Sequence, residues 1–125
     1  MPRNAASRKK AYSRGRQGEF LAMLYLRLKG YRNLVKRYKT PVGEVDLIAR
    51  KRNTIAFIEV KARAKYEDGV EAITYKQQRR CIRAAKYFLS ARPEFSEFDL
   101  RFDAMIVLPG ISLKHLKAAW SEDNF

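Results

Sequence analysis

The sequence is poor in the side chains that build disulfides and soft-metal sites. It contains one cysteine, Cys81, and one histidine, His115. A single cysteine excludes an intramolecular disulfide framework and a cysteine-rich zinc site, and a single histidine argues against a histidine-based metal site. The longest uninterrupted apolar run, Phe20 to Leu26, is far shorter than the roughly 20 residues of a membrane-spanning helix. No apolar segment suited to a secretory signal follows the basic N-terminus, so we expect a soluble, cytoplasmic protein.

Acidic residues are also scarce relative to basic ones. The 125 residues include 27 Lys and Arg but only 13 Asp and Glu, which gives a formal net charge of +14. The length predicts one domain with one modest core, and apolar residues at 46% indicate a globular chain. A charge of this sign and size attracts polyanions. Nucleic acid is therefore the first partner to consider, and an anionic membrane surface the second.

The few acids in the first half of the chain stand out. The first 66 residues hold 18 Lys and Arg but only four acids: Glu19, Glu44, Asp46 and Glu59. Residues 1–16 hold six basic residues and no acid, with little apolar content. This pattern predicts a mobile basic arm over residues 1–14, followed by a folded domain over residues 15–125.

Hydrophobic periodicity divides the folded part into helices and strands. We expect a helix over Gly15–Lys29, largely buried, with an apolar face formed by Phe20, Leu21, Leu24, Tyr25 and Leu28. The remaining expected elements are a basic edge strand over Tyr31–Tyr38, strands over Glu44–Arg50 and Thr54–Arg63, a loop over residues 64–71, a helix over Ile73–Ala91, a strand over Phe98–Leu108, and a short helix capped by Ser112.

The second and third strands are separated by a link of hairpin length, Lys51-Arg52-Asn53. A two-residue loop, Arg52-Asn53, would place Asp46 directly opposite Glu59, with Cβ atoms about 4.5 to 5.5 Å apart. Two adjacent carboxylates repel, so one pKa rises or a cation lies between them. Oxygen donors without His or Cys suit Mg²⁺ or Mn²⁺. Lys61 lies on the same strand face as Glu59 and is placed to hold a phosphate oxygen or to orient a water molecule.

The segments Gly43-Glu44-Val45-Asp46-Leu47-Ile48 and Phe57-Ile58-Glu59-Val60-Lys61-Ala62-Arg63 resemble the Asp…Glu-x-Lys signature of the PD-(D/E)xK nuclease superfamily. More narrowly, the chain resembles the YraN-type family of small bacterial proteins. This likeness extends over roughly residues 15–120. It includes Gly18-Glu19 in the first helix, Lys76-Gln77 at the start of the second, Arg101-Phe102-Asp103, and His115.

The resemblance implies an α/β fold. It would be a single restriction-endonuclease-like domain with an α-β-β-β-α-β core and a mixed central sheet flanked by helices. It also implies a metal-dependent endonuclease that uses Mg²⁺ or Mn²⁺, with Asp46, Glu59 and Glu19 as metal ligands and Lys61 as the catalytic lysine. Val45 stands where the superfamily's name-giving proline would precede Asp46. The implied substrate is DNA, branched or junction DNA included, with RNA as the alternative. Resolution of a junction needs two cuts and would therefore require a homodimer.

Basic residues near this site are the expected phosphate contacts. They are Arg63, after the third strand, and Lys76, Arg79, Arg80 and Arg83 on the second long helix. Gln77 or Gln78 is a candidate to contact water at the metal, and Glu44 a candidate to support the site or to pair with an arginine. Two other functions stay open: a non-enzymatic nucleic-acid-binding protein that keeps the nuclease fold, and a membrane-surface protein bound through its charge.

Overall fold

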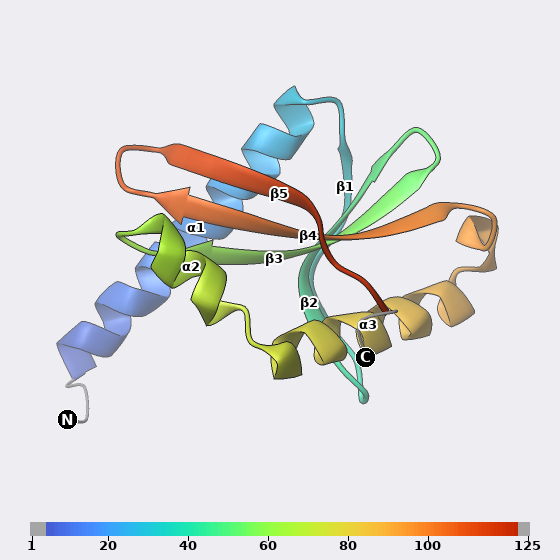
Figure 1. Ribbon diagram of the computed structural model, residues 1–125, viewed down its shortest axis with the longest axis horizontal. Helices are drawn as coiled ribbons and strands as arrows, with labels where there is room; N and C mark the ends of the chain where they lie inside the picture. Colours follow the sequence, from blue (N-terminus) through green and yellow to red (C-terminus); the bar gives the residue numbers. More distant parts are fainter. Residues whose placement is uncertain (1–4, 123–125) are drawn as a thin grey trace.

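The computed structural model describes the backbone of residues 5–122 and the side chains of residues 15–122. The order of helices and strands along the chain is close to the predicted one (Figure 1). The elements are α1 (Ala5–Leu28), β1 (Arg32–Lys39), β2 (Glu44–Lys51), β3 (Thr54–Ala62), α2 (Tyr66–Ala72), α3 (Tyr75–Ala91), a 3-10 turn η1 (Pro93–Phe95), β4 (Asp99–Leu108) and β5 (Ser112–Trp120).

The strands form one mixed sheet in the order β1-β2-β3-β4-β5. Within residues 5–122, β3 and β4 are the only neighbouring strands that run parallel, and the segment between them contains α2 and α3 (Figure 1). The other neighbouring pairs are antiparallel. The expected edge position of the first strand is confirmed, because β1 pairs only with β2 within the described residues.

Each face of the sheet supports its own apolar core. Alternate residues of β3 point to opposite faces, as the strand period requires. Ile55 and Phe57 pack with α3, whereas Ala56 and Ile58 pack with α1. The sheet therefore lies between α1 and α3, with both of its faces covered.

α1 meets the sheet through smaller side chains than its sequence predicts. Gly18 and Ala22 are buried against the sheet, whereas Phe20 is 66% and Leu28 78% exposed. A Cβ atom on Gly18 would lie 3.2 Å from the Cβ of Ala62 on β3, so a larger residue there would push the helix away. The predicted apolar face is confirmed only in part: Leu21 and Tyr25 pack against the core, whereas Phe20, Leu24 and Leu28 are exposed, because the helix approaches the sheet through the side that carries Gly18.

Two helix boundaries also differ from prediction. α1 begins at Ala5, ten residues before the predicted start, and so includes residues 5–14 of the segment assigned to the basic arm. Residues 1–4 lie outside the described part of the chain. The predicted loop over residues 64–71 contains α2, and α3 starts at Tyr75 because the Thr74 side chain caps it by accepting from the Gln77 N–H.

The C-terminal helix predicted from Ser112 was wrong, because that segment is strand β5, antiparallel to β4. The pairing of β5 with β4 shifts register between Leu116, the partner of Ala104, and Trp120, the partner of Phe102. Ala118 lies within this shift and has a left-handed backbone with φ 53°. This irregularity spoils the two-residue period that marks a strand in sequence. Among the described residues, no helix combines the length and apolarity that crossing a bilayer requires.

Candidate active site

The site begins where β2 and β3 stop pairing. The ladder runs with partner numbers that sum to 105 and ends at Leu47 opposite Ile58, which confirms the predicted register. One residue further, Asp46 Oδ2 accepts a hydrogen bond of 2.8 Å from the backbone N–H of Val60. The Val60 N–H would donate to a backbone carbonyl of β2 if the β2–β3 ladder continued, and here it donates to the Asp46 carboxylate.

Asp46 and Glu59 meet at this point, as the register predicts. Each carboxyl group lies within electrostatic reach of the other, and Glu59 is 6% exposed. Burial, followed by the nearby Asp46 charge, raises the pKa of Glu59 to about 8. Burial also raises the pKa of Asp46, although the Val60 N–H and the Lys61 charge oppose this shift. A proton, or a cation in its place, therefore relieves the repulsion between the two carboxyl groups.

Lys61 and Gln77 complete this side of the site. With its amide oxygen facing β3, Gln77 accepts a hydrogen bond of 3.2 Å from Lys61 Nζ, while its amide nitrogen donates to the Ala72 carbonyl at 2.9 Å. The Thr74 cap fixes the first turn of α3, so Gln77 is held at both its backbone and its side chain. The amide orients the ammonium group of Lys61 without neutralising its charge.

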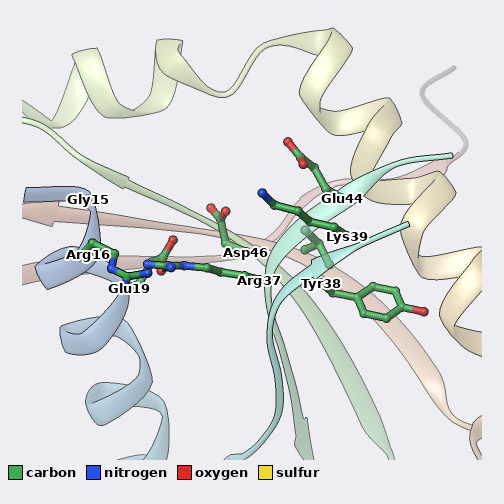
Figure 2. A pocket seen from close by; sticks show the side chains of 9 residues that line it. Gly15, Arg16, Glu19, Arg37, Tyr38, Lys39, Glu44 and Asp46 are labelled. Carbon is green, nitrogen blue, oxygen red and sulfur yellow. The ribbon is translucent and has the colours of Figure 1, made fainter. Parts of the chain in front are cut away.

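Glu19 projects from α1 toward the same region but has another partner. Its Oε2 accepts from Arg37 Nε over 2.7 Å. Burial and the Asp46 charge raise the pKa of Glu19, which places the two acids within electrostatic reach of each other. Both acids line a cavity of about 370 Å³ whose lining comes from α1, β1 and β2. Figure 2 shows the side chains around it. Within the described residues, no three Asp, Glu, His or Cys side chains converge into a metal-binding group.

The predicted phosphate-binding residues differ in their exposure and in their partners. Lys76 and Arg79 are exposed on α3, and Arg63 is exposed just after β3. Arg80 forms an ion pair with Glu44 at 3.4 Å, which is the pairing foreseen for that acid. Arg83 donates from Nε to the Val42 carbonyl at 2.8 Å and so ties α3 to the turn before β2.

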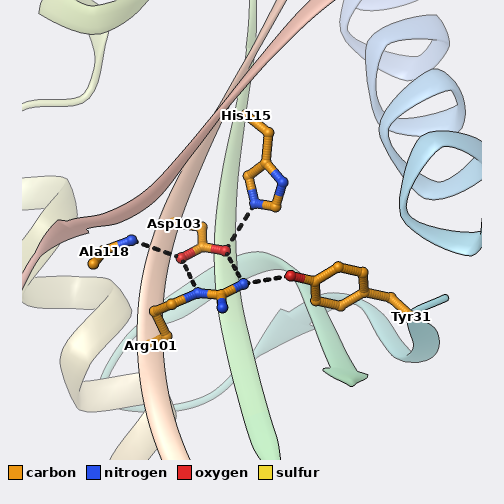
Figure 3. A network of polar contacts seen from close by, with 5 residues as sticks. All are labelled: Tyr31, Arg101, Asp103, His115 and Ala118. Atoms are coloured by element: carbon orange, nitrogen blue, oxygen red, sulfur yellow. Dashed lines mark hydrogen bonds and ion pairs between the residues drawn. The ribbon is translucent and has the colours of Figure 1, made fainter. Parts of the chain in front are cut away.

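A second polar cluster lies within the sheet and outside the candidate site (Figure 3). Asp103 on β4 is fully buried and receives two hydrogen bonds of 2.9 Å from Arg101. His115 Nε2 lies 2.8 Å from its Oδ2, and the Ala118 N–H donates to its Oδ1 at 3.0 Å. Burial favours the neutral acid, but the hydrogen bonds from His115 and Arg101 outweigh it and lower the pKa of Asp103. This cluster stabilises the irregular pairing of β5 with β4.

Sequence reasoning missed Arg37. Its backbone is left-handed, with φ 55°, and it lies between two paired positions of β1, opposite Asp46 on β2. In the sequence it is one of many basic residues in an acid-free stretch. No pattern marks a strand residue with this backbone, so only the structure separates Arg37 from its neighbours.

Comparison with known proteins gives two kinds of match. The model of a family described as "Uncharacterised protein family UPF0102" matches residues 18–107. A UPF0102 protein from Bradyrhizobium diazoefficiens is 52% identical over 110 residues, covering 88% of this chain and 83% of the relative. One from Rhodopseudomonas palustris is 48% identical over 116 residues, covering 93% and 86%.

A solved structure shares the fold. It is Archaeoglobus fulgidus Hjc, described as a Holliday junction resolvase from an archaeal hyperthermophile. The TM-score is 0.53 at 16% sequence identity, and the match covers 86% of this chain and 83% of that one. The likeness confirms the predicted fold class, an α/β domain of the restriction-endonuclease type with a mixed central sheet.

Proposed function

Because the chain belongs to the uncharacterised protein family UPF0102 and has a restriction-endonuclease-like fold, we propose that it is a metal-dependent endonuclease acting on nucleic acid. The observation that carries this proposal is that Asp46 and Glu59 meet where β2 and β3 stop pairing. Lys61 lies two residues after Glu59 on β3, on the same face of the strand. Buried acids in contact are costly for a fold unless they have a use.

The residues fit a divalent cation of the hard class. The donor set is oxygen only, and the charge of a divalent cation would offset the repulsion between the buried Glu59 and Asp46. Asp46 and Glu59 would hold Mg²⁺ or Mn²⁺, with Glu19 as a proposed third carboxylate that still has its Oε1 to offer. When bound, the ion supplies an acidified water molecule and neutralises charge on the phosphate.

The protein's own residues supply orientation and further charge. Lys61, held by the Gln77 amide, keeps its ammonium beside Glu59, where it stabilises negative charge on a phosphate oxygen. The Val60 N–H holds the Asp46 carboxylate in place and favours its charged form. Exposed basic residues on α3, including Lys76 and Arg79, would contact the backbone of the nucleic acid.

DNA is the proposed substrate, and the junction resolvase named among the structural relatives makes branched DNA the first form to test. Resolution of a junction would require two copies of the chain, one for each cut. The decisive assay incubates labelled duplexes, single strands, flaps, forks, four-way junctions and RNA with Mg²⁺ or Mn²⁺, beside the Lys61→Ala variant. Cleavage by the wild type alone supports the proposal, and no cleavage of any substrate contradicts it.

One observation favours a second function, a nucleic-acid-binding protein without catalysis. Glu19 is already paired with Arg37, and no three acids converge among the side chains of residues 15–122. Titration calorimetry with Mn²⁺ separates the two functions. A binding site that Asp46→Ala removes supports the nuclease, whereas an absence of Mn²⁺ binding in the wild type supports the non-catalytic protein.

A further inference from the structure

Arg37 holds a conformation that costs free energy and that the sheet does not require. Its φ of 55° places a long L side chain in the left-handed region, although its neighbours Lys36 and Tyr38 pair normally with β2. Strain of this kind persists only where the surrounding structure holds it in place. Here its result is that the guanidinium group reaches the cavity beside Asp46.

The cavity is suited to an anion despite its acidic side chains. Two of the acids that line it have a counter-charge, because Glu19 is paired with Arg37 and Glu44 with Arg80. Three basic side chains also line it, Arg16 from α1 and Arg37 and Lys39 from β1 (Figure 2). This basic lining favours a polyanion at the cavity.

Glu19 leaves most of the Arg37 fork unused. The ion pair is formed through Nε and Oε2, and the side chain of Arg37 is 31% exposed. A guanidinium group has five N–H donors in a planar arrangement that matches two oxygens of a phosphate. A carboxylate that holds Nε fixes the plane of the group and turns its remaining donors outward.

We propose that Arg37, oriented by Glu19, forms a binding site for one phosphate of a nucleic-acid backbone in the cavity next to Asp46. This site rests on the proposed function for its location beside the cleavage centre. Its chemistry, a diester anion on a pre-oriented guanidinium, also holds for a protein that binds nucleic acid without cutting it. Arg37 is then a substrate-binding residue and Glu19 its positioning residue.

The fold supplies a matched control. Arg52 is exposed, has nearly the same backbone with φ 54°, and lies in the β2–β3 turn at the other end of β2 from Asp46. Arg37→Gly and Arg52→Gly each remove one positive charge and relieve the backbone strain of one arginine with positive φ. Only Arg37 lines the cavity, so a difference between the two variants reports the site and not the charge.

The test measures binding of labelled DNA over a series of salt concentrations, with chelator present so that no cleavage occurs. Each phosphate contact contributes about 0.7 to 0.9 to the slope of log affinity against log salt. We expect Arg37→Gly to lower the slope by about that amount, Arg52→Gly to leave it unchanged, and Arg37→Lys to restore it. Thermal unfolding should show no loss of stability in Arg37→Gly, because glycine accepts this backbone without strain.

Equal slopes for Arg37→Gly, Arg52→Gly and the wild type would overturn the proposal. If Arg37→Gly fails to fold, Arg37→Gln replaces it, because it removes the charge and keeps a side chain at this position. We then expect the lowered slope in Arg37→Gln and the restored slope in Arg37→Lys. The cleavage assay stays separate. If Arg37→Gly lowers the slope but the wild type cleaves no substrate, the phosphate site is supported and the proposed nuclease function is contradicted. If the wild type cleaves DNA but Arg37→Gly leaves the slope unchanged, the nuclease function is supported and the phosphate site is contradicted.

Discussion

The backbone N–H of Val60 donates to Asp46 Oδ2 over 2.8 Å, at the first position where β2 and β3 no longer pair. This bond fixes the carboxylate that we propose as a metal ligand and links it to the strand that carries Glu59. Asp46→Asn keeps the size of the side chain but removes the charge. We expect a loss of cleavage of more than about 100-fold with the fold intact, because loss of a direct ligand exceeds the effect of losing its support. Gel assays of cleavage, with circular dichroism as the control for folding, measure both effects.

Glu59 gives the metal-free protein a specific dependence of stability on pH. Its pKa is about 8 in the folded state against an ordinary value of 4.5, so the folded state binds the proton more tightly than the unfolded state. The resulting stabilisation is fully present below about pH 4.5 and is lost as pH rises to about 8. Chemical denaturation across this range should show the decline in the wild type and a flatter profile in Glu59→Gln. A wild-type profile that rises between these pH values would contradict the burial of Glu59 beside Asp46.

Gln77 orients Lys61 and should affect activity without carrying charge itself. We expect Gln77→Ala to lower the cleavage rate by roughly 10-fold to 100-fold, the range typical of losing a residue that supports an active group. Lys61→Ala should lower it further. Gln78→Ala is the matched control, because the neighbouring Gln78 side chain donates to the Ile73 carbonyl at 3.5 Å instead of accepting from Lys61. Equal effects of Gln77→Ala and Gln78→Ala would show that the Lys61–Gln77 bond has no catalytic role.

Glu19 has two proposed roles that calorimetry separates. As a third metal ligand, its replacement in Glu19→Gln would weaken Mn²⁺ binding by about 10-fold or more. As the positioning residue of Arg37 alone, it would leave Mn²⁺ affinity unchanged and reduce DNA affinity. The measurement is Mn²⁺ titration of the wild type and Glu19→Gln, with DNA binding in chelator as the second readout.

Asp103 supports stability and not chemistry. It is fully buried and bonded to Arg101, His115 and the Ala118 N–H, so its removal leaves donors without their acceptor. Asp103→Ala should cost roughly 3 kcal/mol or more of unfolding free energy, as expected when a buried ion pair loses one member. Urea denaturation measures this loss. Cleavage per folded molecule should stay near the wild-type value, and a selective loss of cleavage at unchanged stability would contradict this assignment.

The meeting of Asp46 and Glu59 could be predicted from sequence because a short hairpin link sets the register, and the ladder follows that register. Elements with a clean period, such as β3 and α3, were also predictable. The face of α1 was not, because Gly18 contributes no apolar signal although its lack of a side chain decides the contact. β5 was missed because Asp103 accepts from the Ala118 N–H at an irregular position and breaks the alternation.

The parallel pairing of β3 with β4 has a consequence for how the domain forms. Every residue of the proposed catalytic group lies between Glu19 and Gln77, yet the strand that shields one edge of β3 begins only at Asp99. During synthesis from the N-terminus, the acids and the lysine therefore leave the ribosome well before their neighbouring strand exists. A nascent chain that stops before residue 99 has an open hydrogen-bonding edge at β3, the strand that carries Glu59. The pairing of this edge is thus completed late, by a strand that begins at Asp99.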